Sequence, residues 1–268
     1  MQPTSDLEVP QLKAKTFRCM GTVISLTVPV APGERSAAAQ EALTDATGAV
    51  ERLFQELDAR FSLYRTESEA SRLARRELTL RAASQDFRDR YAEAAQWRLL
   101  TEGAFTPERP DGVPDLSGLV KGFAIKEAGA ALQSLGLGDW CLNAGGDVLA
   151  TGSPIAGSRA SWQAGIVDPE DRRTLIAAYP LGGGTGVGAL ATSGSAERGD
   201  HIWTSGAGVS AFRQVSVAAA DIVTADVLAT AIVAGGVPML NRATSGWDVE
   251  VLAIRNDGGI LATQGFRA

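Results

Sequence analysis

The sequence predicts an α+β fold built as a single compact unit, and three observations support this prediction. Amphipathic patterns with helical spacing dominate the first half of the chain, whereas short strand-like runs dominate the second half. Their order is mixed and does not follow a regular alternation of strand, helix and strand. No repeat, low-complexity tract or clear interdomain linker divides the 268 residues, which suffice for one large domain or two closely packed halves.

The first predicted strand covers Thr22–Val30, where apolar residues stand at every second position, and Pro29 indicates its end or a sheet edge. A long amphipathic helix is predicted over residues 36–62, because charged residues separate apolar ones at helical spacing. Its apolar face comprises Val50, Leu53, Phe54, Leu57 and Phe61.

Two more helices follow in the sequence. The segment 84–102 continues the helical pattern, with core aromatic residues such as Phe87 and Tyr91, and Gly103 ends it. A third helix ends at Gly136 and is predicted from the spacing of four apolar residues, Ile125, Ala128, Leu132 and Leu135. Further on, the small residues of 152–161 are typical of a surface loop.

Strand-like runs fill most of the chain after Gly136. They read WCLNA, WQAGIV, TLIAAY, VGALAT and RQVSVAAA. A helix over roughly residues 222–235 interrupts them, and VEVLAIRNDGGILAT indicates a hairpin that turns at Asp257–Gly259.

Composition narrows the classes of ligand. The formal net charge of −6 gives no general attraction for nucleic acid or an anionic membrane, so a small-molecule site is favoured. Two cysteines and one histidine argue against a disulfide framework and against zinc, which leaves oxygen ligands and therefore magnesium or calcium. Without a signal-like or membrane-spanning apolar run, we expect a soluble, cytoplasmic protein.

Two motifs combine glycines with polar side chains. In DLSGLVKGFAI, Asp115–Ile125, a helix begins beside Lys121; this suits a phosphate or pyrophosphate, but a plain helix start with a surface lysine explains it equally well. In NAGGD, Asn143–Asp147, paired glycines allow a flat ligand to approach closely or simply form a tight turn.

Two further motifs lie on predicted helices. Asp226 and Thr230 are four residues apart, so they share a helix face and can ligate a hard cation; alternatively, Asp226 is a first-turn residue and Thr230 bonds back to its carbonyl. In YRTESEASRL, Thr66 or Ser68 is expected to cap a short helix. Tyr64 just before it can stack on an aromatic ligand.

The last motif, ATSGSAERGDHIW, contains His201, the only histidine of the chain. Thr192, Ser193 and Gly194 end a strand-like run in a turn rich in hydroxyl and amide donors. A lone histidine is more often structural than catalytic, but a loop of small and charged residues is an unusual place for a core histidine. The residues alone leave its role open.

Taken together and in this order, these segments resemble the ApbE family of FAD:protein FMN transferases. The matching series is MGTVISLTV, FSLYRTESEASRL, DLSGLVKGFA, LNAGGDVLATG, SWQAGIVDP, ALATSGSAERGDHI and VTADVLATAIVAGG. The sequences of these motifs are most similar to those of shorter family members from high-GC Gram-positive bacteria. The resemblance implies an ApbE-like, T-fold-like arrangement of mixed sheets and packed helices, with residues 1–16 as an N-terminal extension and 17–268 as the flavin transferase domain.

The resemblance also implies an activity. The family transfers the FMN half of FAD to a threonine hydroxyl of an acceptor flavoprotein, with Mg²⁺, and releases AMP. Asp226, Thr230 and a backbone carbonyl near Val120 are the implied Mg²⁺ ligands, and Asp226 and His201 are the implied catalytic residues, His201 orienting or deprotonating the threonine. The implied flavin-binding residues are Met20, Tyr64, Asp115, Lys121, Asn143, Gly145, Gly146, Asp147, Thr192, Ser193 and Gly194.

The chain departs from the family's pattern at two places. Thr106 replaces the aspartate of a Phe-Asp-Pro motif, and Trp203-Thr204 replaces the Asp-Pro that follows His-Ile. Two alternatives therefore accompany the transferase prediction: an FAD pyrophosphatase that yields FMN and AMP, and a non-catalytic FAD-binding protein.

Overall fold

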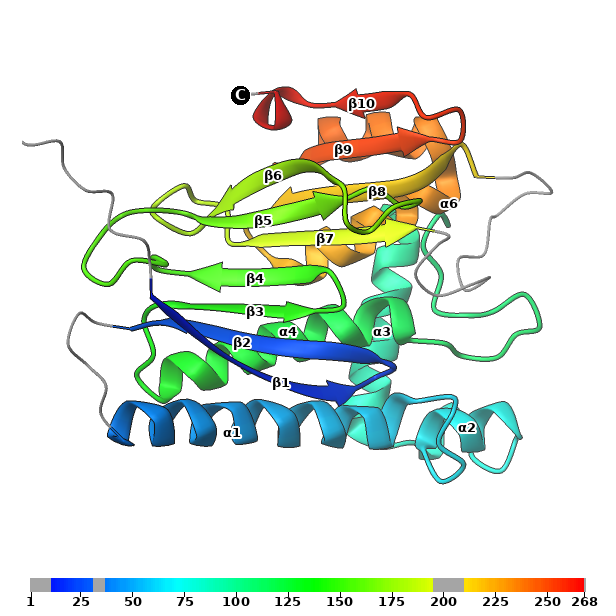
Figure 1. Cartoon of the computed structure of the whole chain (residues 1–268). Helices are drawn as coiled ribbons and strands as arrows, with labels where there is room; N and C mark the ends of the chain where they lie inside the picture. The colour runs from blue at the N-terminus through cyan, green and yellow to red at the C-terminus, as the bar shows by residue number, and fades with distance from the viewer. Residues whose placement is uncertain (1–10, 31–36, 195–209, 268) are drawn as a thin grey trace, which may run out of the picture.

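The fold is organised around one antiparallel sheet (Figure 1). The computed structural model describes residues 11–30, 37–194 and 210–267. Its eight-stranded sheet has the order β1-β2-β3-β4-β7-β8-β9-β10, and β5 pairs with β6 in a separate two-stranded sheet. The strands are β1 (Leu12–Cys19), β2 (Thr22–Pro29), β3 (Trp140–Ala144), β4 (Asp147–Thr151), β5 (Trp162–Val167), β6 (Leu175–Leu181), β7 (Ala189–Gly194), β8 (Phe212–Ala219), β9 (Glu250–Arg255) and β10 (Ile260–Ala262). This confirms the predicted α+β class.

Helices cover one face of the large sheet, as Figure 1 shows. They are α1 (Ala37–Phe61), α2 (Glu69–Ala74), α3 (Gln85–Leu100), α4 (Ser117–Ser134) and α6 (Ile222–Gly246). Helix α6 packs on β7, β8 and α4, and α1 packs on α4 and β1. The main hydrophobic core fills the space between these helices and the sheet, with Phe54, Phe87 and Ile125 fully buried.

The β5–β6 hairpin covers the other face of the sheet. Alternation along β8 explains how both faces are filled: Val215 and Val217 point into the main core, whereas Ala218 belongs to a second apolar cluster. That cluster joins Trp162 of β5 to Leu190 of β7. Because apolar layers lie on both sides, the middle strands are buried on both faces.

Most predicted elements are confirmed. The helices predicted over 36–62 and 84–102 correspond to α1 and α3, and Gly103 follows α3 with a φ of +85°. Ser68 caps α2 by accepting a hydrogen bond from the Ser71 N–H (3.0 Å). The third predicted helix corresponds to α4, which ends at Ser134, two residues before the predicted end at Gly136, and Leu135 is its exposed C-cap residue.

Strand β1 is an unexpected element. It begins at Leu12, inside the segment 1–16 assigned to an extension, and it pairs with β2 along its whole length. Only Phe17 and Cys19 of β1 are buried, so the strand carries little of the apolar alternation that would predict it. It forms one edge of the large sheet.

Helix α6 is longer than predicted. The expected helix 222–235 ends where the structure has a kink at Gly236 (φ 64°, ψ −151°), and helical structure continues beyond Pro238 to Gly246. Within the described ranges, α6 is the helix whose length and apolar composition would suffice to cross a membrane, but 61% of its apolar window is buried in the protein. It is a core helix of this fold.

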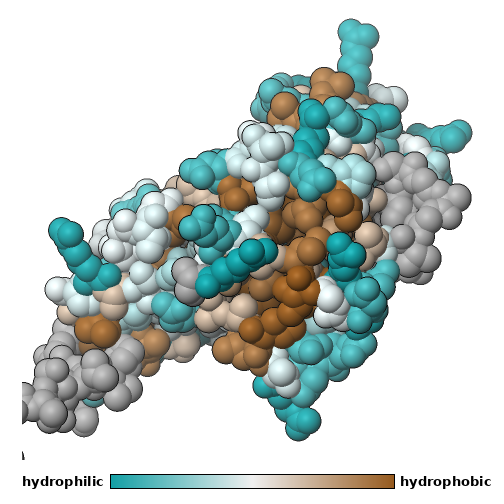
Figure 2. Space-filling view, turned by 90° about the horizontal axis from the view of Figure 1, so that it is seen from above, coloured by the Kyte–Doolittle hydropathy of each residue, from teal (hydrophilic) through white to brown (hydrophobic). Residues whose placement is uncertain are grey.

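The molecule also has an apolar surface at the β10 edge. Figure 2 looks onto this side and shows apolar side chains gathered in the middle of the face, with polar side chains around them. Ile260 of β10 and Val237 of α6 are among the exposed large apolar residues. This face takes no part in the site described below.

The start of α6 provides a test of the fold. Asp221 caps the helix by accepting a hydrogen bond from the Thr224 N–H (2.9 Å), and it pairs with Lys126 of α4 (2.8 Å). Burial alone would raise the pKa of Asp221, but the Lys126 and Thr224 hydrogen bonds outweigh it and lower this pKa. Because the pKa is lower in the folded state, the ionised carboxylate stabilises the folded protein at pH values above the unfolded pKa of about 4. This stabilisation is lost as the pH falls through the folded pKa.

We predict that Asp221→Ala lowers the free energy of unfolding by about 1 kcal/mol at pH 7, the usual value of a lost N-cap. The difference from wild type should shrink below about pH 4, as the wild-type carboxylate becomes protonated. Urea denaturation as a function of pH measures both effects. Asp221→Asn, which keeps a capping oxygen, should retain most of the stability, and an equal loss in both variants would argue against the cap.

Candidate functional site

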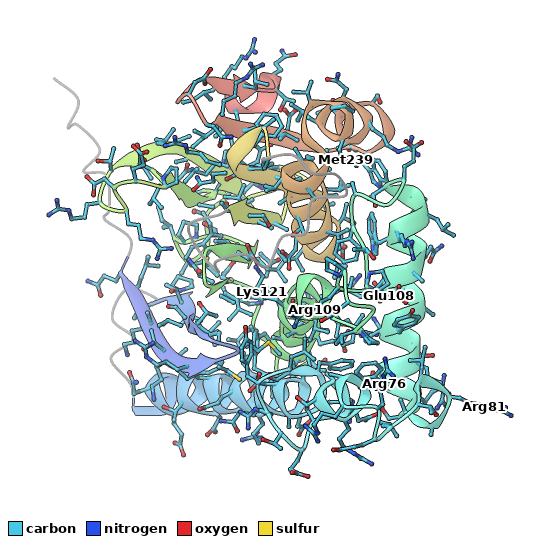
Figure 3. The ribbon with its side chains drawn as sticks, turned by 90° about the vertical axis from the view of Figure 1, so that its right-hand side faces the viewer. Arg76, Arg81, Glu108, Arg109, Lys121 and Met239 are labelled. Atoms are coloured by element: carbon cyan, nitrogen blue, oxygen red, sulfur yellow. The ribbon has the colours of Figure 1, made fainter. Side chains whose placement is uncertain are left out.

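A buried ion cluster joins three elements that are far apart in the sequence. Lys121 of α4 forms ion pairs through its Nζ with Asp147 Oδ2 and with Asp226 Oδ1 of α6, the latter at 3.4 Å. Lys121, Asp147 and Asp226 are 7%, 0% and 2% exposed. Figure 3 looks onto this end of the molecule, with Lys121 near its middle. The idea of a plain surface lysine is therefore wrong.

Asp147 connects the cluster to the sheet. The residue begins β4 directly after the Gly145-Gly146 turn, and its Oδ1 accepts a hydrogen bond from the Thr192 N–H of β7 (3.0 Å). Each carboxylate oxygen of Asp147 thus has its own partner, one on β7 and one on α4. This pattern fixes the side chain in one orientation.

The turn before Asp147 depends on glycine. Gly145 has a φ of +64°, and a Cβ at this position would lie 2.4 Å from Thr22 Oγ1. Asn143 Oδ1 accepts a hydrogen bond from the Gly146 N–H (3.0 Å) and closes the turn. The tight-turn interpretation of this motif is confirmed, and the turn connects β3, which pairs with β2, to β4.

Hydroxyl groups continue the site beyond the ions. Ser193 Oγ lies 3.0 Å from Thr230 Oγ1, so the end of β7 touches the same face of α6 that carries Asp226. Thr192 Oγ1 lies 2.8 Å from Ser216 Oγ. Because Asp221 is the N-cap and Asp226 lies beyond the first turn of α6, the first-turn interpretation of Asp226 is wrong.

Helices α4 and α6 approach each other closely at Gly122. A Cβ there would lie 3.2 Å from Val223 Cα and 3.3 Å from Asp226 Oδ2, which is tighter than ordinary packing. Any larger residue would push the helices apart beside the ion cluster. Val120 and Lys121, which precede this glycine, are held buried in the first turns of α4.

Asp115, Met20 and Tyr64, which were also predicted to belong to the site, lie in three other parts of the fold. Asp115 Oδ1 accepts a hydrogen bond from the Ser117 N–H (3.0 Å) and so organises the start of α4. Met20 occupies the β1–β2 turn with a φ of +49°, and Tyr64 follows α1 with 83% of its surface exposed. His201 and Trp203 lie outside the described residues. The structure thus joins Lys121, Asp147 and Asp226 directly.

Most of the chain matches the model of a known protein family. The ApbE family model matches residues 20–111 and 108–252. The chain belongs to the ApbE family. No curated protein sequence is significantly similar to it.

Several solved ApbE structures share the fold. The flavin transferase ApbE from Vibrio cholerae has a TM-score of 0.73 and 22% identity, covering 97% of this chain and 99% of that chain. The ApbE protein from Thermotoga maritima has a TM-score of 0.73 and 18% identity, covering 96% and 98%. The apo form of the flavinyl transferase ApbE from Pseudomonas stutzeri has a TM-score of 0.72 and 18% identity, covering 98% of each chain. These structures confirm an ApbE-like fold.

The donor set of this ApbE-family chain fits a hard cation. Asp226, Thr230 and a main-chain carbonyl of Val120 are all oxygen donors, as Mg²⁺ prefers. The formal charges of Lys121, Asp147 and Asp226 sum to −1, so a further cation would offset a buried excess of negative charge. The described residues contain no cluster of three or more His, Cys, Asp and Glu side chains suited to a metal, and the donor set above needs only one such residue.

Sequence reasoning missed two contributors to the site. Ser216 is fully buried in β8 and contacts Thr192 through its hydroxyl. The sequence feature that could have identified Ser216 is its position as the one polar residue in the run VSVAAA. Gly122 was quoted within a motif but not singled out, although its lack of a side chain permits the contact between α4 and Asp226. Such a requirement becomes visible only when the partner helix is placed.

The ion cluster leads to a stability prediction. Lys121→Met removes the cation between two buried carboxylates, so the free energy of unfolding should fall by about 3–5 kcal/mol in buffer without divalent metal. Lys126→Met, which breaks the half-exposed pair with Asp221 on the same helices, should cost no more than about 1 kcal/mol. Urea denaturation compares the two variants. Similar losses in both would contradict a special role for Lys121.

Proposed function

We propose that the protein is a Mg²⁺-dependent FAD:protein FMN transferase. The observation that carries this proposal is the contact of Lys121 with Asp147 and Asp226, because it unites three motifs of the ApbE family in one buried site. Three similar solved structures belong to this family, and two of them are named flavin or flavinyl transferases. We further propose that the chain belongs with the shorter members from high-GC Gram-positive bacteria, because the sequences of its motifs resemble theirs.

In the proposed reaction, a threonine hydroxyl of an acceptor flavoprotein attacks the phosphorus of the FMN half of FAD. A bond forms between the threonine Oγ and this phosphorus, and the bond from the phosphorus to the bridging oxygen breaks. AMP leaves with the bridging oxygen, and the threonine proton passes to a base, for which we propose His201. The products are an FMN phosphoester on threonine and AMP.

The buried groups suit this chemistry. Asp226 and Thr230, with the Val120 carbonyl, are the proposed Mg²⁺ ligands, and bound Mg²⁺ would neutralise charge on the pyrophosphate. Lys121 holds Asp226 and Asp147 in fixed positions, so the ligand carboxylate is oriented before substrate binds. The Ser193–Thr230 contact orients the hydroxyl of Thr230.

The flavin is proposed to lie along the turns at this end of the sheet. The segments that would contact it contain Met20, Tyr64, Asp115, Lys121, Asn143, Gly145, Gly146, Asp147, Thr192, Ser193 and Gly194. Tyr64 is well exposed and therefore accessible to a planar ring system. The β3–β4 turn, in which Gly145 and Gly146 have φ values of +64° and +98°, is the part of the sheet end proposed to face the flavin.

We predict that the protein, FAD and Mg²⁺ together add one FMN to a flavoprotein encoded beside its gene, as seen by intact-protein mass spectrometry. Asp226→Asn should slow this transfer by on the order of 100-fold or more, because the carboxylate ligand of the proposed Mg²⁺ site is lost. EDTA should stop transfer by the wild-type protein. Asp221→Asn, the same substitution on the same helix, should leave the rate close to wild type.

The same mixture separates the alternatives suggested by Trp203-Thr204 and Thr106. Release of FMN and AMP with no mass increase on the acceptor would indicate an FAD pyrophosphatase. Binding of FAD, measured by quenched flavin fluorescence, with no product of either kind would indicate a flavin-binding protein. Either outcome would contradict the transferase proposal.

A further inference from the structure

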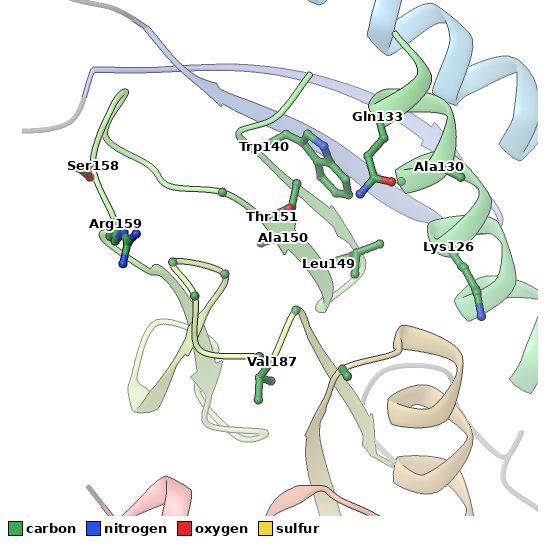
Figure 4. Close-up of a pocket in the computed structure, with 18 residues that line it drawn as sticks. Lys126, Ala130, Gln133, Trp140, Leu149, Ala150, Thr151, Ser158, Arg159 and Val187 are labelled. Carbon is green, nitrogen blue, oxygen red and sulfur yellow. The ribbon is translucent and has the colours of Figure 1, made fainter. Parts of the chain in front are cut away.

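A cavity of about 960 Å³ lies away from the ion cluster, between α4, the end of β4 and two loops (Figure 4). Helix α4 contributes Lys126, Ala130 and Gln133, and the loops contribute residues 158–159 and 182–188. None of the proposed flavin or metal residues lines it. Its volume lies within the usual range of small-molecule sites.

The charged side chains that line the cavity are basic. Lys126 and Arg159 lie on opposite sides of the cavity in Figure 4, and no Asp or Glu belongs to its described lining. Lys126 pairs with Asp221, whereas Arg159 forms no ion pair or hydrogen bond with a described residue. The nearby Asp139 caps the Gly152-Ser153 turn through the Ser153 N–H (2.8 Å). In a protein with a net charge of −6, such a lining favours an anion.

A glycine-rich loop supplies backbone donors. Gly184 and Gly186 have φ values of +91° and +78°, and a Cβ at either would meet nothing within 4 Å, so both border open space. Hydrogen bonds from the Gly182 N–H to Val187 O (2.9 Å) and from the Thr185 N–H to Gly182 O (3.0 Å) hold the loop. The N–H groups of Gly184 and Gly186 donate to no described atom. Exposed backbone N–H groups with glycine conformations are suited to bind phosphate oxygens.

The remaining wall of the cavity is apolar. Leu149, Ala150 and Val187 line it together with Gly129 of α4. Trp140 closes one end and is almost fully buried, and its indole Nε1 has no hydrogen-bond partner among the described residues. A ligand with one anionic end and one apolar, planar end would match both parts of this surface.

We propose that this cavity binds a small phosphate ester with a planar organic part, at a site separate from the flavin site. Arg159 would contact the phosphate in a bidentate manner, and the Gly184 and Gly186 N–H groups would donate to it. The organic part would lie against Leu149 and Val187. The proposal does not depend on flavin transfer, because it rests on residues that the transferase proposal does not use.

Isothermal titration with AMP tests the proposal, with adenosine and inorganic phosphate as comparison ligands. The full chain should bind AMP, phosphate more weakly, and adenosine not measurably. Arg159→Gln should weaken AMP binding about tenfold or more, because a charge-assisted contact is lost. Ala130→Trp, at an exposed position of α4 that lines the cavity, should fill it and abolish AMP binding at this site.

Two controls distinguish this site from others. Arg173→Gln removes an arginine whose side chain is 93% exposed and outside the cavity, and it should bind AMP like wild type. Asp226→Asn alters the proposed metal site and reports any AMP that is held there as a reaction product. Equal binding of AMP and adenosine, or no effect of Arg159→Gln, would overturn the proposal. The proposal would also be overturned if Asp226→Asn lost AMP binding while Arg159→Gln bound AMP as tightly as wild type. Arg159 is exposed, so its variant remains informative even if Ala130→Trp does not fold.

Discussion

Lys121 is the cation on which the arrangement of this site depends. Its ammonium lies against carboxylates from β4 and α6, and the three groups are almost completely buried. Two carboxylates withdrawn from water and facing each other would repel, and a buried charge without a partner costs several kcal/mol. The lysine therefore allows the strand and the two helices to meet at one point.

The surrounding structure is adapted to this contact. Gly122 lets α4 approach α6 at Asp226, and Gly145 lets the β3–β4 turn pass beside Thr22. The Thr192 N–H bonds the second oxygen of Asp147, and Ser193 reaches Thr230. Each of these contacts joins residues distant in sequence, so the site is rigid only when the whole fold has formed. Such preorganisation is what metal-assisted phosphoryl transfer requires of a protein.

Local patterns in the sequence predicted much of the fold. The spacing in α1 and the alternation in β2 report directly which side is buried, so these elements were predictable. Strand β1 was missed because only Phe17 and Cys19 face the core, and the second half of α6 was missed because Gly235-Gly236 and Pro238 are typical helix-ending signals. In both cases tertiary packing overrides a weak local preference.

The candidate site was predictable as a set of motifs but not as a geometry. Resemblance to the ApbE family selected Lys121, Asp147 and Asp226, yet assigned the lysine and Asp147 to flavin binding. Their mutual contact depends on how α4 and α6 cross, which no local pattern encodes. Ser216 and Gly122 were overlooked for the same reason, since their importance lies in what faces them.

A double-mutant cycle of Lys121→Met and Asp147→Asn, measured by urea denaturation without divalent metal, tests the central claim most directly. If the ammonium and the carboxylate stabilise each other in the buried cluster, the two substitutions should show a coupling energy of about 1–3 kcal/mol. Asp147→Asn keeps an oxygen for the Thr192 N–H, so the cycle isolates the ion pair. Additivity within about 0.3 kcal/mol would contradict the account.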